Sequence, residues 1–462
     1  MQQGTAPELA ALDVGDKRRE DRARGLVERM AAKPDGSIPQ ACQGPAEVKA
    51  AYRFLSNEAV DPDDIRKALY EPCIDRIAGH NGVILAIQDT TSFNFTTHHA
   101  CEGIGPLGAR DTDDFQGLHC HTVLAATGSG VPLGILDQKL WARDEEDHGS
   151  RHERKHRPIN EKESFRWIES LRAIHERIPP DKLVITVTDR EGDIFELLAE
   201  PRPPNSRLLV RACQNRALTT EGDHVLDAAK AVPEAGRLTK TLHRGDSRRA
   251  HKAELSLRYC QVSIKPPVVG THDPDLEPVP MTVISLQEIS PPEDCDGVDW
   301  VLLTDMDIDG YEAAVTCVEY YTNRWLIERF HYTLKSGCRI EESQLRTTDR
   351  LERLLVLYCI VALRLLWITY YNRHNPQLPC TVAFTQLEWQ TVCRIEHPEE
   401  PVPDKPPPLR EITRYVAKLG GFLGRKSDGH PGVKVIWRGI MRLQDIIIGV
   451  QLQLLDQDVG KG

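Results

Sequence analysis

Short runs of apolar residues, each bounded by polar or turn-forming residues, recur along the first two thirds of the chain. Residues 83–88 read Val-Ile-Leu-Ala-Ile-Gln, and residues 183–188 read Leu-Val-Ile-Thr-Val-Thr. Runs of this length and composition predict buried β-strands. The other strand-like segments are 118–136, which predicts a hairpin around Gly128-Ser129-Gly130, then 207–212 and 300–304.

Helical patterns surround these strands. Residues 1–80 predict a helical unit, in which Asp61-Pro62 before an acidic first turn marks a helix start. The apolar run Leu354–Tyr371 contains Arg364 and is shorter than the roughly 20 apolar residues of a membrane span. We therefore expect a buried helix there. The other predicted helices are 161–177, 192–198, 311–336, 349–372 and the tail from 409 onward.

A change of pattern divides the α/β region. Between about 214 and 298, short β-like runs alternate with Pro-rich turns, which predicts a β-strand insertion between the halves of one α/β domain. Glu399–Pro408 contains five prolines and is predicted to be a linker. The expected architecture is an α/β domain interrupted by β-strands and flanked by helical N- and C-terminal units, in line with the two to four domains expected for 462 residues.

Composition is that of a globular protein, with 40% hydrophobic and 27% charged residues. The net charge of −11, from 58 basic and 69 acidic residues, argues by itself against a nucleic-acid partner. The charge is unevenly distributed, however. Lys17–Arg24 carries five basic and two acidic residues, and Arg410–Arg442 carries eight basic and two acidic residues. The first segment fits either a solvated helix face or a phosphate-contacting helix.

Cellular location is suggested by the cysteines and the N-terminus. The twelve cysteines form no C-x-x-C pair, and the N-terminus lacks the basic and apolar segments of a secretory signal. We expect a cytoplasmic protein with reduced thiols and no membrane partner.

Three carboxylates stand at positions suited to chemistry. Asp89 and Asp189 each follow a predicted buried strand, and ligands of α/β sheets gather beyond the carboxyl ends of strands. Two acids there could share a hard cation such as Mg²⁺, although either alone fits a turn residue or a helix cap. The third acid, Glu328, belongs to the predicted helix 311–336.

That helix carries a mixed charged face. At about 100° per residue, Tyr321, Arg324, Glu328 and Lys335 lie on one side of a continuous helix. The pattern fits a salt-bridged surface helix, with Glu328 pairing Arg324. It equally fits a phosphodiester site, where cations contact phosphates and carboxylates hold metal.

Six blocks of sequence together resemble the bacterial cut-and-paste DDE transposases of the IS-four family, most closely the Tn-five-like branch. The resemblance runs from about residue 9 to about 450. Its motifs are Gly15-Asp16-Lys17-Arg18-Arg19 with Ala51-Tyr52-Arg53-Phe54-Leu55, Gln88-Asp89-Thr90-Thr91, Thr188-Asp189-Arg190-Glu191-Gly192-Asp193-Ile194, Tyr321-x2-Arg324-x3-Glu328-x6-Lys335, and Leu419-Gly420-Gly421-Phe422.

The resemblance implies an RNase H-like (retroviral-integrase-type) catalytic domain at 81–372, with the β insertion at about 214–298. It implies an N-terminal DNA-end-binding domain at 1–80 and a C-terminal dimerisation domain at 373–462. Asp89, Asp189 and Glu328 would be the catalytic residues and would bind two Mg²⁺ ions per site, for which Mn²⁺ is expected to substitute. One site would nick the transposon end, form and open a hairpin, and join the end to target DNA.

The resemblance also implies DNA contacts. Tyr321, Arg324 and Lys335 match residues at the terminal phosphates. Trp300 matches a residue that stacks near a flipped base, although on its own it fits a core aromatic at a strand start. The remaining expected contacts are Arg211, His331, Arg18, Arg19 and Arg22. The implied partners are the terminal inverted repeats, the target DNA and a second copy of the chain in a homodimeric synaptic complex.

Two other functions stay open. One is an RNase H-like nuclease that cuts without strand transfer, and the other is a non-catalytic DNA-binding regulator of transposition. The Asp305–Gly310 segment imitates the start of a calcium loop, but Thr316 stands where the bidentate Glu would be. His148, His152 and His156, with His119-Cys120-His121 nearby, could ligate metal, but their charged setting favours a solvated loop or helix.

Overall fold

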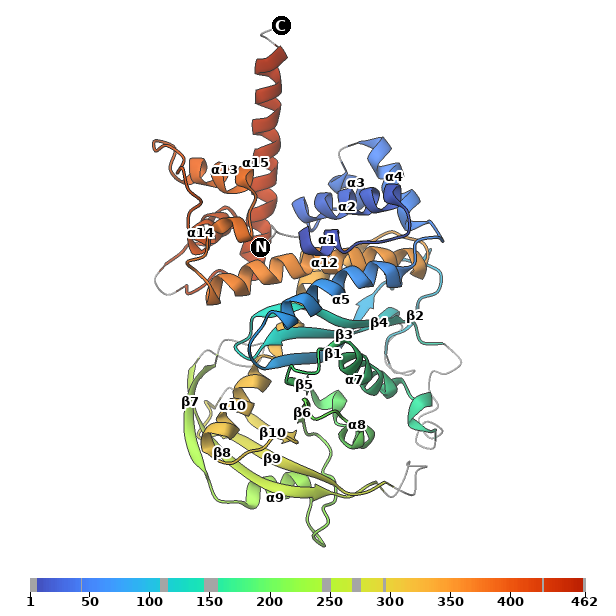
Figure 1. Cartoon of the computed structure of the whole chain (residues 1–462), viewed down its shortest axis with the longest axis vertical. Helices are drawn as coiled ribbons and strands as arrows, with labels where there is room; N and C mark the ends of the chain where they lie inside the picture. The colour runs from blue at the N-terminus through green and yellow to red at the C-terminus, as the bar shows by residue number, and fades with distance from the viewer. Residues whose placement is uncertain are drawn as a thin grey trace.

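The chain forms one mixed α/β body with helical units at both ends of the sequence (Figure 1). The computed structural model describes residues 6–42, 44–108, 115–144, 157–242, 251–267, 276–293, 296–425 and 428–459. The N-terminal helices (blue in Figure 1) lie beside the long helix α12, Thr348–His374.

Residues 6–78 form the predicted helical unit. Its helices are α1 (Ala6–Ala10), α2 (Lys17–Ala32), α3 (Ile38–Ala41), α4 (Pro45–Leu55) and α5 (Pro62–Ala78). Asp61 caps α5 by accepting a hydrogen bond of 2.9 Å from the backbone N of Asp63, which confirms the predicted helix start. Buried Arg353 of α12 donates to the carbonyl oxygens of Val60 (2.7 Å) and Leu55 (3.3 Å), and so fastens this unit to the rest of the protein.

The strands described here form one ten-stranded sheet in the order β2-β3-β1-β5-β6-β10-β9-β8-β7, with β4 paired to β3. β1 is antiparallel to β3 and parallel to β5, and β5 is parallel to β6. This arrangement is the expected RNase H-like fold, and β3 and β4 are the predicted hairpin. The strands are β1 (Ile84–Asn94), β2 (Gly105–Pro106), β3 (Gln116–Thr127), β4 (Pro132–Trp141), β5 (Val184–Thr188), β6 (Ser206–Arg211), β7 (Gly236–Leu242), β8 (His251–Ile264), β9 (Val279–Glu288) and β10 (Asp299–Thr304).

The insertion between β6 and β10 is β-rich, as predicted, and it also contains the helix α9 (Val225–Ala231). Its strands do not form a separate sheet. β10 pairs antiparallel with β6 on one side and with β9 on the other, so β7, β8 and β9 extend the central sheet.

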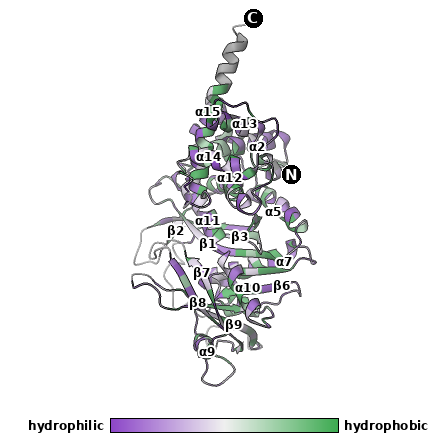
Figure 2. Cartoon of the chain, turned by 90° about the vertical axis from the view of Figure 1, so that its left-hand side faces the viewer, coloured by the Kyte–Doolittle hydropathy of each residue, from purple (hydrophilic) through white to green (hydrophobic). Residues whose placement is uncertain are grey.

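Helices cover both faces of the sheet. α7 (Arg166–Arg177) packs on one face, while α12 and α11 (Trp325–Tyr332) lie on the other, with α11 between α12 and the sheet (Figure 2). By length and composition α12 could cross a membrane, but most of it is buried among other elements, which is the behaviour of a core helix. The remaining helices and turns before α12 are η1 (Ile159–Glu161), η2 (Glu163–Phe165), η3 (Arg190–Gly192), α8 (Phe195–Ala199), α10 (Tyr311–Thr322), the π-turn η4 (Thr333–Gly337) and η5 (Ile340–Glu342).

The prediction of one helix over 311–336 is wrong. α10 ends at Thr322, α11 begins at Trp325, and the segment closes in the π-turn η4. At the break, Asn323 donates a hydrogen bond of 3.0 Å to the carbonyl oxygen of Gly128 in the β3–β4 turn. Gly130 in the same turn has φ +88°, and a Cβ there would lie 2.6 Å from Oδ1 of Asn323. A tertiary contact therefore interrupts the helix.

The C-terminal unit contains α13 (Gln386–Glu396), α14 (Leu409–Leu419) and α15 (Val433–Val459), with a short turn η6 (Cys380–Val382) before them. α15 extends away from the rest of the chain (Figure 1). The predicted linker at 399–408 does not separate domains. It folds back within this unit, because the carbonyl of Pro407 accepts from the N of Cys380 at 2.8 Å and Leu409 N donates to Leu378 O at 2.7 Å.

The Leu419-Gly420-Gly421-Phe422 block marks a close crossing of α14 and α15. A Cβ at Gly420 would lie 1.8 Å from the carbonyl oxygen of Val435, and one at Gly439 would lie 1.8 Å from that of Val416. Gly421 has φ +94°, which favours glycine. Only glycine allows the two backbones to approach this closely.

Gly439→Ala is expected to lower the free energy of unfolding by about 1–3 kcal/mol, because the methyl group must push two backbones apart. Gly449→Ala in the same helix is the matched control. A Cβ at Gly449 meets nothing within 4 Å, so this variant should be as stable as the parent or slightly more stable. Urea denaturation followed by circular dichroism measures both, and equal midpoints for the two variants would contradict the crossing.

Candidate active site

The register of β1 and β5 brings two aspartates to the same level of the sheet. Each paired residue of β5 is numbered 100 higher than its partner in β1, from Ile84 with Val184 to Ile87 with Val187. The same offset places Asp89 level with Asp189. Asp189 directly follows its strand, as predicted. Asp89 does not, because β1 continues to Asn94 in its pairing with β3.

Both carboxylates project from the face of the sheet that α11 covers. Successive side chains of a strand alternate between faces. Leu85 and Ile87 of β1, like Ile185 and Val187 of β5, pack into the core that contains α11 and α12. Asp89 and Asp189 follow the same alternation and therefore point to this side.

Glu328 of α11 lies within range of the charges of the two aspartates. Burial raises its pKa above the ordinary value, and the negative charges of Asp89 and Asp189 raise it further. The pKa of Asp189 is raised by burial and then by the charge of Asp89. The backbone N of Glu191 donates to Oδ1 of Asp189 at 2.8 Å and orients that carboxylate. The three carboxylates are therefore close enough to interact electrostatically.

The donor set fits a hard divalent cation, because carboxylate oxygens are the ligands that Mg²⁺ prefers and their mutual repulsion favours a cation. In the arrangement observed here, Glu328 is ion-paired with Arg324 four residues earlier in the chain. Among the residues with described coordinates, no three His, Cys, Asp or Glu side chains are already grouped to hold a metal ion. Metal binding by all three acids therefore requires their side chains to come closer together, and Arg324 competes with a cation for Glu328.

Four of the predicted DNA-contacting residues form one cluster beside the acids. The ring of Trp300 meets that of Tyr321 edge-on at 5.0 Å, and the guanidinium of Arg211 lies 5.8 Å from the Trp300 ring. Arg324 lies 6.0 Å from the Tyr321 ring. Arg211 and Trp300 belong to β6 and β10, while Tyr321 lies in the last turn of α10, so the sheet and the interrupted helix build the cluster together.

Tyr321 and His331 are more buried than a surface contact requires. Tyr321 is 3% exposed. Burial raises the pKa of its hydroxyl, against the opposing charges of Arg324 and Arg211. The His331 side chain is 6% exposed, with Nδ1 at 3.7 Å from Oδ2 of Asp89. This position favours a role for His331 at Asp89 over direct contact with DNA.

The other predicted DNA contacts lie apart from the acids. Lys335 belongs to the π-turn η4, with its ammonium 5.8 Å from the ring of Phe93. Arg18 and Arg22 are exposed on α2. Arg19 is half-buried and donates to the carbonyl oxygens of Val14 at 3.2 Å and Ala59 at 3.0 Å, which gives it a structural task in the N-terminal unit.

Thr90 and Asp193 belong to the motif blocks, but the sequence assigned no role to either of them. The Thr90 hydroxyl lies 2.9 Å from Nδ1 of His121 and accepts from Arg166 at 3.0 Å. Asp193 is buried and holds the start of the insertion through the backbone N of Cys213 at 2.8 Å and the guanidinium of Arg216 at 2.9 Å. These contacts join residues far apart in the chain, and no local pattern could have predicted them.

The two alternative metal sites do not gain support. Asp305 accepts from Arg202 at 2.8 Å and from the backbone N of Leu208 at 2.6 Å, so its carboxylate is a structural acceptor. His119 and His121 are buried within β3, in the segment predicted as a strand, and the expectation of a solvated loop or helix concerned Arg143–Arg157. His148, His152 and His156 lie outside the described residues.

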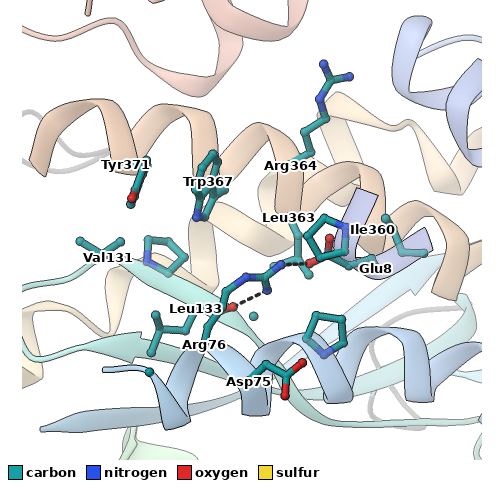
Figure 3. Close-up of a pocket in the computed structure, with 15 residues that line it drawn as sticks. Glu8, Asp75, Arg76, Val131, Leu133, Ile360, Leu363, Arg364, Trp367 and Tyr371 are labelled. Carbon is teal, nitrogen blue, oxygen red and sulfur yellow. Dashed lines mark hydrogen bonds and ion pairs between the residues drawn. The ribbon is translucent and has the colours of Figure 1, made fainter. Parts of the chain in front are cut away.

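A separate cavity of about 420 Å³ lies between α1, α5, the start of β4 and α12 (Figure 3). Its lining includes Trp367, Tyr371 and the ion pair of Arg76 with Glu8. None of the predicted site residues lines this cavity, so it is not the candidate active site.

Comparison with known families agrees with the fold and the site. The model of the transposase DDE domain matches residues 113–364, more than half of the chain. The protein therefore belongs to the DDE transposases, enzymes that act on DNA and generally use divalent metal ions. The flanking segments match the transposase DNA-binding family at residues 1–60 and the Tn5 transposase dimerisation domain at 360–454. Together these matches place the chain among the Tn5/IS4-like DNA transposases, with DNA and a second transposase subunit as partners.

One solved structure, the piggyBac transposase synaptic complex with hairpin DNA, is also similar. It is 12% identical, and the match covers 95% of this chain and 81% of that chain, with a TM-score of 0.37. A similarity this low carries no argument about the site.

The crowded carboxylates predict a pH-dependent cost in stability. Because the pKa of Asp189 is raised in the folded protein, the folded state binds more protons than the unfolded state between the two pKa values. Stability therefore falls as the pH rises through this window, and the cost is fully present above it. Asp189→Asn should raise the melting temperature at pH 7 and have little effect below the window.

Thermal unfolding across pH measures this difference. Asp181→Asn is the control, because the Asp181 side chain is 71% exposed in the segment before β5. A lower melting temperature for Asp189→Asn at pH 7 would contradict the mutual repulsion of the acids.

Proposed function

We propose that this protein performs cut-and-paste transposition of an insertion sequence. Its one active site would nick the transposon end, form and open a hairpin, and join the freed end to target DNA. The observation that carries the proposal is the meeting of Asp89, Asp189 and Glu328 beside the cluster of Arg324, Tyr321, Trp300 and Arg211. Carboxylates that can bind a cation thus lie next to basic side chains that can bind phosphates.

Asp89, Asp189 and Glu328 would hold two divalent cations, with Mg²⁺ as the physiological ion and Mn²⁺ able to replace it. The bound ions would activate the attacking hydroxyl group and stabilise the leaving oxygen. The Glu191 backbone N keeps the Asp189 carboxylate in place, and His331 lies against Asp89. These contacts orient the acids before a cation arrives.

The basic and aromatic cluster would bind the terminal nucleotides. Arg324 and Lys335 supply charge for the phosphates, and half-exposed Trp300 supplies a ring for an unstacked base. Tyr321 is buried between Trp300 and Arg324, so we assign it the task of supporting both. Arg211, over the Trp300 ring, adds a further cation to this surface.

We assign end recognition to residues 1–80, catalysis to 81–372 and dimerisation to 373–462. Arg18 and Arg22 are free to meet DNA on the exposed side of α2, which a net charge of −11 does not prevent, because local charge decides the contact. Since its substrate is DNA, the protein would act in the cytoplasm on the terminal inverted repeats and the target.

The alternatives receive less support. A regulator without chemistry has no need for carboxylates so placed that the charge of Asp89 raises the pKa of both Asp189 and Glu328 at a cost in stability. A nuclease without strand transfer needs neither a dimerisation domain nor a base-stacking cluster beside the acids.

Glu328→Gln should abolish excision, by about 10³-fold or more, and leave DNA-end binding intact, because the amide keeps the size of the side chain but not its charge. The assay uses a supercoiled plasmid that carries this gene with its native flanking DNA, with Mg²⁺ or Ca²⁺. For the parent protein, the expected result is excision at two inverted ends with Mg²⁺ and none with Ca²⁺.

The matched control is Glu319→Gln on α10, whose side chain is 59% exposed and ion-paired with Lys240. It should cut at the parental rate. Wild-type cutting by Glu328→Gln would show that the acids are misassigned, and scattered cutting by the parent would favour the nuclease.

Arg324→Ala should strengthen the binding of Mg²⁺ and weaken the binding of the DNA end. It frees Glu328, so Mg²⁺ should bind the DNA-free protein several-fold more tightly. It also removes a phosphate contact, so end binding should weaken and the slope of its salt dependence should fall by about one ion. Calorimetry and gel shifts at several salt concentrations measure the two effects. Unchanged metal affinity together with unchanged salt dependence would refute the double role of Arg324.

A further inference from the structure

The two aspartates lie where the backbone no longer holds their strands together. Hydrogen-bonded pairing of β1 with β5 ends at Ile87 and Val187, two residues before the acids. Two carboxylates at the same level of the sheet repel each other. β1 remains paired with β3 and β5 with β6 at this level, so a side-chain contact across the gap adds to these pairings in setting the separation of the two acids.

Arg166 spans the gap from the opposite face of the sheet. It is the first residue of α7, and its side chain is 13% exposed. Its Nε donates to the hydroxyl of Thr90 at 3.0 Å, and its Nη2 donates to Oε2 of Glu191 at 3.0 Å. Thr90 adjoins Asp89, and the backbone N of Glu191 binds Asp189. One guanidinium thus links the two aspartate segments.

The guanidinium has little freedom to move. The rings of Trp141 and Trp167 lie 5.5 and 5.6 Å from its central carbon, and its Nη1 donates to the carbonyl oxygen of Glu163 at 2.9 Å. A planar cation held by aromatic rings and a backbone acceptor keeps one orientation. It can therefore determine where Thr90 and Glu191 lie.

The contact at Thr90 is continued into the core. A guanidinium can only donate, so the Thr90 oxygen accepts from Arg166 and its hydrogen is available to Nδ1 of His121 at 2.9 Å. Nε2 of the neutral imidazole then carries the proton and faces Oε1 of Gln88 at 3.1 Å. This chain of hydrogen bonds fixes the Thr90 side chain from both sides.

The contact at Glu191 is more open, because the Glu191 side chain is 60% exposed. An exposed ion pair is weak on its own. Here it matters for placement, since Glu191 is a fourth carboxylate two residues from Asp189. Pairing with Arg166 fixes this carboxylate and offsets its charge, which otherwise adds to those of Asp189 and Asp89.

We propose that Arg166 is a positioning residue that sets the separation of Asp89 and Asp189 for cation binding. The proposal rests on the cation site assigned above. Mg²⁺ demands near-ideal octahedral geometry at 2.0–2.1 Å, whereas Ca²⁺ accepts irregular sites with longer bonds. Loss of Arg166 therefore weakens Mg²⁺ binding more than Ca²⁺ binding.

The test compares Arg166→Met and Arg166→Lys in the full-length protein. Methionine can still pack against the tryptophans but donates no hydrogen bond and carries no charge. Lysine keeps the charge but loses the planar guanidinium, which donates to Thr90 and Glu191 at the same time. In calorimetry without DNA, Mg²⁺ affinity should fall about 10- to 100-fold in Arg166→Met, and by less in Arg166→Lys. Ca²⁺ affinity should fall less than Mg²⁺ affinity in both.

Arg172→Met is the matched control, because Arg172 lies on the same helix and pairs with Glu200 at 2.6 Å away from the acids. It should bind both cations as the parent does. DNA-end binding in EDTA and the melting temperature report on the fold, and both should stay near the parental values in Arg166→Lys.

A double-mutant cycle of Arg166→Met with Thr90→Val adds a second readout. If Arg166 acts through Thr90, the combined loss of Mg²⁺ affinity should be smaller than the sum of the single losses. Additive losses would overturn this route.

Three further results would overturn the proposal. The first is parental Mg²⁺ affinity in Arg166→Met. The second is an equal loss of Mg²⁺ and Ca²⁺ affinity accompanied by loss of DNA-end binding in EDTA in both Arg166 variants, which would mark a purely structural residue. The third is parental Mg²⁺ affinity in Asp89→Asn, which would remove the cation site itself and so locate the failure in the proposed function.

Discussion

The site depends on the parallel pairing of β1 with β5. Its register sets Asp89 level with Asp189, and the alternation of the strands turns both toward α11. The same geometry brings two like charges together in a partly buried place, which raises the pKa of Asp189 and of Glu328. Folding energy from the apolar core offsets this repulsion, and a cation or a protonated acid would relieve it.

The helix opposite the sheet is organised by a second constraint. The β3–β4 turn holds Asn323 and interrupts the helix just before Arg324. The break lets Tyr321 enter the core against Trp300 while Arg324 and Glu328 stay half-buried beside the acids. The interruption at Asn323 thus lies between the residue that supports the cluster and the charged groups beside the acids.

The extension of the sheet explains how the insertion takes part. β10 joins β6 on one side and β9 on the other, so the strands that carry Arg211 and Trp300 belong to the same sheet as the aspartates. The insertion is therefore a continuation of the catalytic sheet. Asp193 is held by Arg216 and the backbone N of Cys213. It thereby connects the segment that follows Asp189 to the first residues of the insertion.

The sequence by itself determined the local elements and singled out the three acids as candidates, because apolar runs, helix caps and motif spacing are properties of neighbouring residues. It predicted β1, β5, β6, the hairpin and the buried helix α12, and it ranked Asp89, Asp189 and Glu328 above other acids. Only the tertiary structure decided the break at Asn323, the burial of Tyr321 and His331, and the link from Arg166 to Thr90 and Glu191. Each of these depends on contacts between residues far apart in the chain, which periodicity and spacing do not encode.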